Sequence, residues 1–442
     1  MNTNTVRVRG RPAGALAMAT LGFFGGFAGV SIFGPLVPKF SHAMALSPVE
    51  AGLLAAIANL SGSLLRIPFG AWVDSAGGKR PFLILLLASW LGVAGTAWLV
   101  HAAYPAHLQG MYPVLLLLGL LSGAGIGTFS VGIAQVSYWF PRSRQGGALG
   151  TYAGLGNTAP GIFAGLLPAL VLAWGMVSAY AGWAVFLGLI ILLYALLMHD
   201  APSFQLRRQG LPADAAAVAA YGQELLPAGS ARAGLARAAR RPATWLLVAF
   251  YFTSFGGFLA LTAWLPSFWH TAYHERLQAA GLLTLSFSLL SSLVRVPGGI
   301  LADRLSIRYA LAVNLLVMGT GALLVMGAGS PGAALAGTLV IALGMGLQNA
   351  VVFKLLPRYV PDAMGGAAGW VGGLGALGGF VIPPLQGLAV QLVGGPHPYA
   401  ASFGVLLALV ALDLALVPWL GRQPQGVLAA PGLAAEVSES AG

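Results

Sequence analysis

Length, composition and charge exclude a soluble globular protein. The chain has 442 residues, of which 58% are hydrophobic and only 7% are charged. A soluble protein carries about 25% charged residues, which keep its surface in water. The net charge of +11 is spread over short segments between apolar stretches, as in a membrane protein, and does not indicate nucleic-acid binding. The absence of cysteine excludes disulfides and thiolate metal sites.

Apolar stretches long enough to span a membrane recur through the chain, since about 20 apolar residues in a helix cross a bilayer. Twelve are expected, at about 13–38, 48–73, 81–101, 111–139, 146–172, 178–198, 243–269, 277–302, 309–328, 332–356, 363–393 and 398–420. This pattern predicts an all-α polytopic membrane protein with a six-helix bundle at 1–199 and another at 243–420. The stretch 200–242 is interpreted as a charged linker, either a tether or a carrier of one short amphipathic helix. Residues 421–442 are expected to form a disordered tail.

Lysine and arginine fall almost entirely on one side of these predicted spans. That side takes Arg7, Arg9, Arg11, Lys79, Arg80, Arg142, Arg144, six arginines between 207 and 241, Arg304, Arg308, Arg358 and Arg422. The other side takes only Lys39 and Arg276. By the positive-inside rule, both termini and the 200–242 linker are expected in the cytoplasm. No cleavable signal peptide is expected.

Two arginines stand inside apolar spans at matching places in the two halves. The stretch from Asn59 to Asp74 returns as Ser288 to Asp303. Arg66 matches Arg295 at an offset of 229 positions, and the offset is kept by Pro68 and Pro297, by Gly70 and Gly299, and by Asp74 and Asp303. A charged side chain inside hydrocarbon costs roughly 3 kcal/mol. The pair therefore predicts the anion-binding arginines of a transporter.

The repeat extends beyond these arginines and resembles a known architecture. Residues 23–40 match residues 251–268, which pairs Phe27 with Phe255. Twelve spans, a basic central loop and a duplicated second span resemble the major facilitator superfamily, whose two six-helix bundles are related by a pseudo-twofold axis with substrate bound between them. The loops that follow both arginine spans also resemble its signature. Their acidic and basic members are interpreted as gating ion pairs, or alternatively as determinants of topology: Asp74, Arg80, Asp303 and Arg308.

Spans five and eleven are rich in glycine, which lets helices approach closely. Their signature glycines are Gly154, Gly156 and Gly161, and Gly373, Gly375 and Gly378. Together with the paired arginines, the motifs 145–150, 154–157, 251–256 and 346–354 resemble those of the nitrate/nitrite porter family. Ala376 stands where the fifth span has Asn157, so the chain looks like the bacterial branch, with one amide at the site.

The resemblance implies a site and a function. A nitrate or nitrite anion would be held between Arg66 and Arg295, with Asn157 near it. The aromatic rings around it would be Phe27, Phe129, Tyr251, Phe255 and Phe353. The implied protein is a monomeric, multi-pass transporter of the bacterial inner membrane. It would bind small inorganic anions and lipid, with no nucleic acid, metal, cofactor or enzymatic activity.

Two further charged residues inside the predicted spans are considered for coupling, Asp413 and Lys354. Asp413 is interpreted as a packing or snorkelling residue because it lies in the last span. Lys354 is interpreted as a charge that attracts anions, or alternatively as a proton-linked site. Because two empty arginines repel each other, exchange is the simpler mechanism, and nitrate/nitrite antiport is predicted.

Three alternatives stay open. The first is proton–nitrate symport, and the second is exchange of small organic carboxylates. The third is a non-transporting anion sensor. A membrane enzyme is disfavoured because no nucleophile–base pair or metal constellation is evident.

Overall fold

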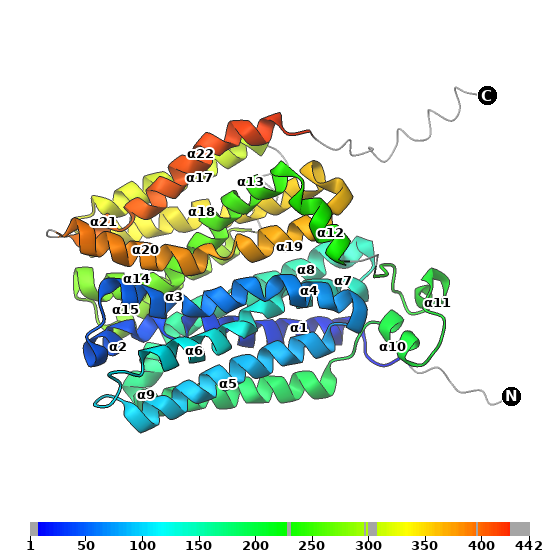
Figure 1. Ribbon diagram of the computed structural model, residues 1–442, viewed down its shortest axis with the longest axis horizontal. Coiled ribbons are helices and arrows are strands. Elements are labelled where there is room, and N and C mark those ends of the chain that lie inside the picture. The colour runs from blue at the N-terminus through cyan, green and yellow to red at the C-terminus, as the bar shows by residue number, and fades with distance from the viewer. Residues whose placement is uncertain (1–7, 228–230, 296–297, 299–306, 395–396, 425–442) are drawn as a thin grey trace.

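The computed structural model describes residues 8–227, 231–295, 298, 307–394 and 397–424, and the regular elements of these residues are all helical (Figure 1). Ten helical segments in this part of the chain are long and apolar enough to cross a membrane. The longest, Arg142–Leu197, is broken at Gly175, whose φ of +80° no helix accommodates, so it provides two spans. With the shorter apolar helix Leu277–Leu293, the predicted twelve spans are confirmed.

The first six spans are built from helices that are often interrupted at glycine or proline. Span one contains α1 (Pro12–Phe27), η1 (Ala28–Ser31), η2 (Gly34–Leu36) and α2 (Val37–Met44), and span two contains α3 (Pro48–Leu64) and α4 (Arg66–Ala76). Then follow α5 (Lys79–Ala103), α6 (Tyr112–Gly123), η3 (Ala124–Gly127), α7 (Thr128–Trp139), α8 (Arg142–Gly156) and α9 (Ala159–Leu197). Helix α3 starts with a capping box, in which Ser47 and Glu50 each bond the other's backbone N–H.

The last six spans repeat this plan. Span seven contains α13 (Pro242–Tyr251), the π-helix η4 (Phe252–Gly256) and α14 (Gly257–Tyr273). The rest are α15 (Leu277–Leu293), α17 (Ile307–Met326), α18 (Pro331–Tyr359), η5 (Pro361–Ala363), α19 (Met364–Leu374), α20 (Gly378–Val393), α21 (Pro398–Ala401) and α22 (Gly404–Arg422). Pro297, Gly299, Asp303, Arg304 and the predicted tail from 425 onward lie outside the described residues.

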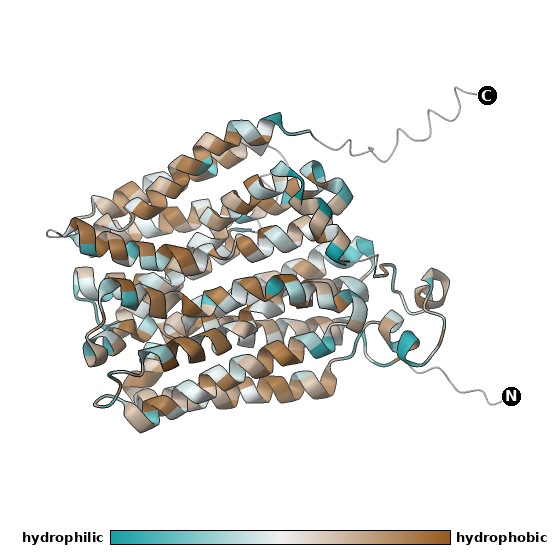
Figure 2. Ribbon diagram, in the orientation of Figure 1, coloured by the Kyte–Doolittle hydropathy of each residue, from teal (hydrophilic) through white to brown (hydrophobic). Residues whose placement is uncertain are grey.

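The linker is more ordered than a tether. It forms α10 (Pro202–Arg208), α11 (Ala215–Ala219) and α12 (Ala231–Ala239). Hydrophilic residues gather on α10 and α12, whereas α11 consists of alanine and valine (Figure 2). Buried Asp200 fixes its start, accepting the Lys79 backbone N–H at 2.8 Å and pairing with Arg208. Helix α12 packs on α19 instead, where Trp370 Nε1 donates to the Leu235 carbonyl at 3.0 Å. Each end of the described linker is therefore docked onto a different half.

We call the end of the molecule that holds Pro12 and Arg422 the termini side, and the end that holds Met44 and Pro48 the far side. On the far side the two halves pack closely, α3 against α20 and α9 against α15. Gly52 lies against the Pro383 carbonyl, and Gly387 against the Pro48 carbonyl, with no room for a Cβ. A Cβ on Gly146 or Gly150, on the termini side of α8, would meet nothing within 4 Å.

Candidate functional site

Arg66 lies deep in the molecule, where span two is interrupted. Pro68 has no N–H to bond the Leu64 carbonyl, so α3 ends at Leu64 and α4 begins at Arg66. The Arg66 side chain is buried, and its Nη1 donates to the carbonyl oxygen of Gly372 on α19 at 3.0 Å. Its Nε and Nη2 are buried without a hydrogen-bond partner. Arg66 therefore brings a permanent charge and spare donors to the contact between the halves.

Arg295 occupies the matching place, directly after α15. Its Nε and Nη2 are also buried without a hydrogen-bond partner. Both guanidinium groups lie against the ring of Phe255, with Cζ at 5.1 Å from its centroid for Arg66 and 5.0 Å for Arg295. The two charges can be no farther apart than the sum of those distances. The structure thus brings the two arginines, one from each half, to the same ring.

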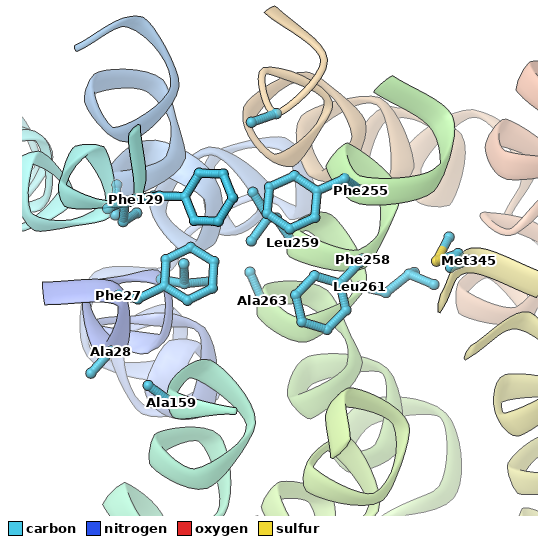
Figure 3. Close-up of a cluster of buried hydrophobic side chains, with 14 of the residues drawn as sticks. Phe27, Ala28, Phe129, Ala159, Phe255, Phe258, Leu259, Leu261, Ala263 and Met345 are labelled. Atoms are coloured by element: carbon cyan, nitrogen blue, oxygen red, sulfur yellow. The ribbon is translucent and has the colours of Figure 1, made fainter. Parts of the chain in front are cut away.

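Aromatic rings complete the surroundings of the two charges. Phe129 lies 4.9 Å from Arg66, and Phe258 lies 5.8 Å from Arg295. A guanidinium within about 6 Å of a ring is attracted by the electron-rich face. Figure 3 shows Phe27 and Phe129 on one side of this cluster and Phe255 and Phe258 on the other. The rings stabilise two buried charges without neutralising them, so the site keeps its positive potential.

Phe27 and Phe255, which the repeat pairs, are parallel to within 2° with centroids 6.4 Å apart. Figure 3 shows the two rings displaced sideways from each other, so the centroid distance is not the width of a slot between facing rings.

The other predicted aromatic residues extend from this pair. Tyr251 stacks on Phe255 at 4.9 Å, and Phe353 meets Tyr251 edge-on at 5.1 Å. The structure thus brings together Phe27, Phe129, Tyr251 and Phe255, and places Phe353 one ring farther out. Phe258 was missed because its partner in the repeat is Val30, so a search for matched aromatics could not find it.

Asn157 lies at the end of α8 with 1% of its surface exposed. Its Nδ2 donates to the Ala153 carbonyl of its own helix at 2.6 Å, and its Oδ1 has no partner. Its backbone oxygen accepts a hydrogen bond from Ser292 on α15 at 3.2 Å. The residue joins the two halves, and its amide nitrogen has a second N–H that the bond to Ala153 does not use.

Comparison with known proteins supplies independent information. The family model described as Major Facilitator Superfamily matches residues 19–285 and 269–438. The probable nitrate/nitrite antiporter NarK1 of Thermus thermophilus is 33% identical over 430 residues, covering 90% of this chain and 89% of that protein. The chain belongs to the nitrate/nitrite porter family of the major facilitator superfamily. The probable nitrate/nitrite transporter NarK2 of Mycobacterium tuberculosis (strain H37Rv) is 31% identical over 387 residues, covering 86% of this chain and 90% of that protein.

Solved structures agree on the architecture of this family member. The partially occluded inward-open form of the xylose transporter XylE from E. coli matches with a TM-score of 0.72 and 14% identity, covering 94% of this chain and 98% of that chain. A D-xylose–proton symporter matches with a TM-score of 0.73 and 15% identity, covering 92% of this chain and 97% of that chain. Likeness at this level of identity concerns the fold alone, and it confirms the predicted major facilitator architecture.

The signature glycines of the porter fold have different neighbours. Gly156 packs on Phe23, Gly375 on Tyr251, and Gly378 on the backbone of Gly256. These three let the glycine-rich spans approach the aromatic spans within each half. A side chain at any of them would displace a ring or a backbone segment near the arginines.

Two further signature glycines lie at the contact between the halves. Gly161 faces Ser288 on α15, and Gly373 faces Ile67 on α4. A Cβ on Gly154 would meet nothing within 4 Å. The glycine pattern thus combines packing within a half, packing across the halves, and one position in open space.

The predicted gating residues of the porter are only partly described. Asp74 accepts a hydrogen bond from the Tyr138 hydroxyl at 2.6 Å. Arg80 lines a cavity of about 370 Å3 together with Ser75, Ala76, Phe204, Arg207 and Arg208. Asp303 and the side chain of Arg308 lie outside the described residues, so a gating role for the two acidic and basic pairs stays a prediction.

Asp413 is buried, with 1% of its surface exposed, so the snorkelling interpretation is wrong. It lies on α22, which contacts the π-helix η4. Lys354 is partly buried and directly follows Phe353 on α18. Its proposed part in coupling stays a prediction.

Proposed function

We propose that this protein transports nitrate and nitrite by alternating access, as an antiporter that holds the anion between Arg66 and Arg295. The observation that carries the proposal is the pair of buried guanidinium groups, which both have unpartnered donors and both contact the Phe255 ring. A guanidinium offers planar, fork-shaped donors that match the oxygens of a small planar anion. The names of the relatives, a probable nitrate/nitrite antiporter and a probable nitrate/nitrite transporter, support the same substrates.

Shape selection would come from the aromatic faces around the two arginines. A planar anion can lie flat along such a face, whereas a tetrahedral anion is thicker. Planar nitrate and bent nitrite therefore fit better than sulfate or phosphate.

Exchange follows from electrostatics. Even at the largest separation that their ring distances allow, about 10 Å, two unit charges repel by about 2 kcal/mol at an effective dielectric constant of 20. An anion between the arginines removes that repulsion and lets the halves close around it. The empty carrier would reorient slowly, so net flux in one direction would be small and exchange would dominate.

The proposal includes the orientation of the protein in its membrane. The basic residues gather at the termini side, which we assign to the cytoplasm of a bacterial inner membrane. The closely packed far side would then face outward, and the described state would face inward. The bundles at 1–199 and 243–420, the linker at 200–242 and a monomeric state complete the proposal.

The test is anion uptake into proteoliposomes loaded with nitrite or left empty. Wild type should take up nitrate only into loaded vesicles, and Arg66→Lys and Arg295→Lys should each lose at least about 100-fold, because a lysine cannot bind an anion with two parallel hydrogen bonds. Arg232→Lys, at an exposed position on α12, is the matched control and should transport normally.

Other outcomes would redirect the proposal. Uptake into empty vesicles that increases with an inward proton gradient would replace antiport by symport and make Lys354 the residue to test. Exchange of small carboxylates in place of nitrate would change the substrate class. Binding of nitrate without flux would indicate an anion sensor.

A further inference from the structure

Each arginine is preceded by a short row of polar side chains on the same helix face. On α3 the row is Asn59 and Ser63, and Arg66 follows it. On α15 it is Ser288 and Ser292, and Arg295 follows it. The rows match at the same offset of 229 positions as the arginines. Steps of four and three residues keep all members of a row on one side of a helix.

Both rows lie between the far side and the arginines, at the contact between the halves. Asn59 Nδ2 donates to the Gly379 carbonyl on α20 at 3.1 Å. Ser292 donates to the Asn157 carbonyl across the halves at 3.2 Å. The Ser288 side chain faces Gly161 on α9 so closely that a Cβ there would lie 2.6 Å from its hydroxyl oxygen. Asn59, Ser288 and Ser292 therefore lie at the contact between the halves.

Several of these groups have no partner in the closed arrangement. The hydroxyl oxygens of Ser63, Ser288 and Ser291 are buried without a hydrogen bond, as is Asn59 Oδ1. Other hydroxyls of the same helix do find one, since Thr284 donates to the Ala280 carbonyl at 2.8 Å and Ser286 to the Leu283 carbonyl at 2.7 Å. Hydroxyls in apolar helices ordinarily bond to their own backbone in this way. A buried hydroxyl left without a partner is destabilising, so these groups call for an explanation.

We propose that Ser63 and Ser288, with Asn59 and Ser292 beside them, form an access subsite that receives nitrate or nitrite from the far side before it reaches the arginines. The inference rests on the proposed transport function, because the subsite opens only when the halves separate at the far side. Hydroxyl groups donate to an anion without adding charge. They hold it weakly, which suits a site that an ion must enter and leave.

The spacing of the two rows suits a stepwise transfer. Ser63 and Ser292 each precede their arginine by three residues, which is about 4.5 Å along a helix, and Ser288 precedes Arg295 by seven residues, or about 10.5 Å. An anion that leaves Ser63 or Ser292 therefore meets the guanidinium donors within about one ionic diameter. It can exchange water for hydroxyl groups and then hydroxyl groups for arginine, with no step in bare hydrocarbon.

The first experiment uses the absence of cysteine, which makes any introduced thiol unique. Ser63→Cys and Ser288→Cys should react with a membrane-impermeant thiol reagent added on the far side, and nitrate should slow the reaction. Ser89→Cys is the matched control, since Ser89 is equally buried but bonds to the Ser122 carbonyl inside one half, and it should stay unlabelled. Thiols at 63 and 288 that react no faster than the thiol at 89 overturn the subsite.

The second experiment measures exchange from each side in oriented vesicles. Ser63→Ala and Ser288→Ala should raise the KM for far-side nitrate about 3- to 10-fold, as expected for one lost hydrogen bond, and leave the KM on the termini side unchanged. Equal changes on both sides, or none, contradict the subsite and leave the transport function intact if wild type exchanges. If wild type itself exchanges no anion, the proposed function fails, and that result is separate from the labelling result.

Discussion

Span one and span seven are copies of one repeat, yet they surround their central phenylalanines differently. In span one, Phe27 ends α1 and the 3-10 turn η1 follows. The two residues before it are glycines: Gly25 packs on Ile190, and Gly26 packs on the backbone of Gly125. This arrangement is apolar and leaves no space.

In span seven, Phe255 lies within the π-helix η4. The residues that match the two glycines are Thr253 and Ser254, and Thr253 lies beside the buried Asp413. Ser254 donates to the Phe250 carbonyl at 2.8 Å. At these two positions the C-terminal copy has polar side chains in place of glycine, and its close glycine contact comes one residue after the ring, between Gly256 and Gly378.

The difference indicates that the two halves share the site unequally. The Phe255 ring contacts both guanidinium groups, whereas the cation–ring contacts seen in the described residues do not include Phe27. Single-turn π-helices often mark functional positions, because the extra residue allows a local adjustment. We infer that span seven adjusts to the anion and that span one is the rigid wall.

The largest effect on stability is expected when the apolar residue that packs on span one becomes acidic. The matching change replaces the acidic residue beside span seven by an apolar one. Ile190→Asp places a carboxyl against Gly25, which offers no hydroxyl, and should cost several kcal/mol of folding free energy. Asp413→Leu should cost less than about 1 kcal/mol, because replacing a buried polar group by an apolar one of similar size is often nearly neutral. The measurement is the thermal midpoint in detergent. A larger loss at Asp413 than at Ile190 would mean that the acid is a stabilising element.

Removing the central rings should have the next largest effect, on transport. Phe255→Ala removes contacts with both arginines and should lower kcat/KM about 10- to 100-fold, at about 0.5 to 2 kcal/mol for each contact. Phe27→Ala should lower it less, because the ring forms only the opposite wall of the pair. Phe255→Leu separates volume from electrostatics, since it fills the space without a ring face. Normal exchange by the leucine variant would contradict the role given to the ring.

Much of this arrangement was predictable from the chain itself. Apolar stretches and the 229-residue offset are visible in the amino-acid sequence, so the twelve spans and the pairing of Arg66 with Arg295 could be predicted. Phe258 and the partnerless hydroxyl of Ser288 could not, because their roles depend on which helices face each other. The docking of α12 was missed for the same reason: it depends on backbone contact between Gly234 and Gly366, which no local pattern encodes.

The smallest effects should come from Gly26→Ala and Ser254→Ala, which add one methyl group or remove one hydroxyl group directly before Phe27 and Phe255. Gly26→Ala would place a Cβ 2.6 Å from the Gly125 carbonyl oxygen, so a backbone segment would have to shift. Overpacking of this kind typically costs about 1 to 3 kcal/mol. Ser254→Ala loses only a bond within its own helix and should cost less than about 1 kcal/mol.

The thermal midpoints and exchange rates of these two variants test whether span one is rigid and span seven adjusts. If span one is the rigid wall, Gly26→Ala lowers the midpoint and also slows exchange, because the shifted backbone moves Phe27 away from Phe255. If span seven adjusts, Ser254→Ala changes both quantities little, since the π-helix can absorb the loss. Tolerance at Gly26 together with sensitivity at Ser254 would reverse the assignment and make span one the part that adapts to the anion.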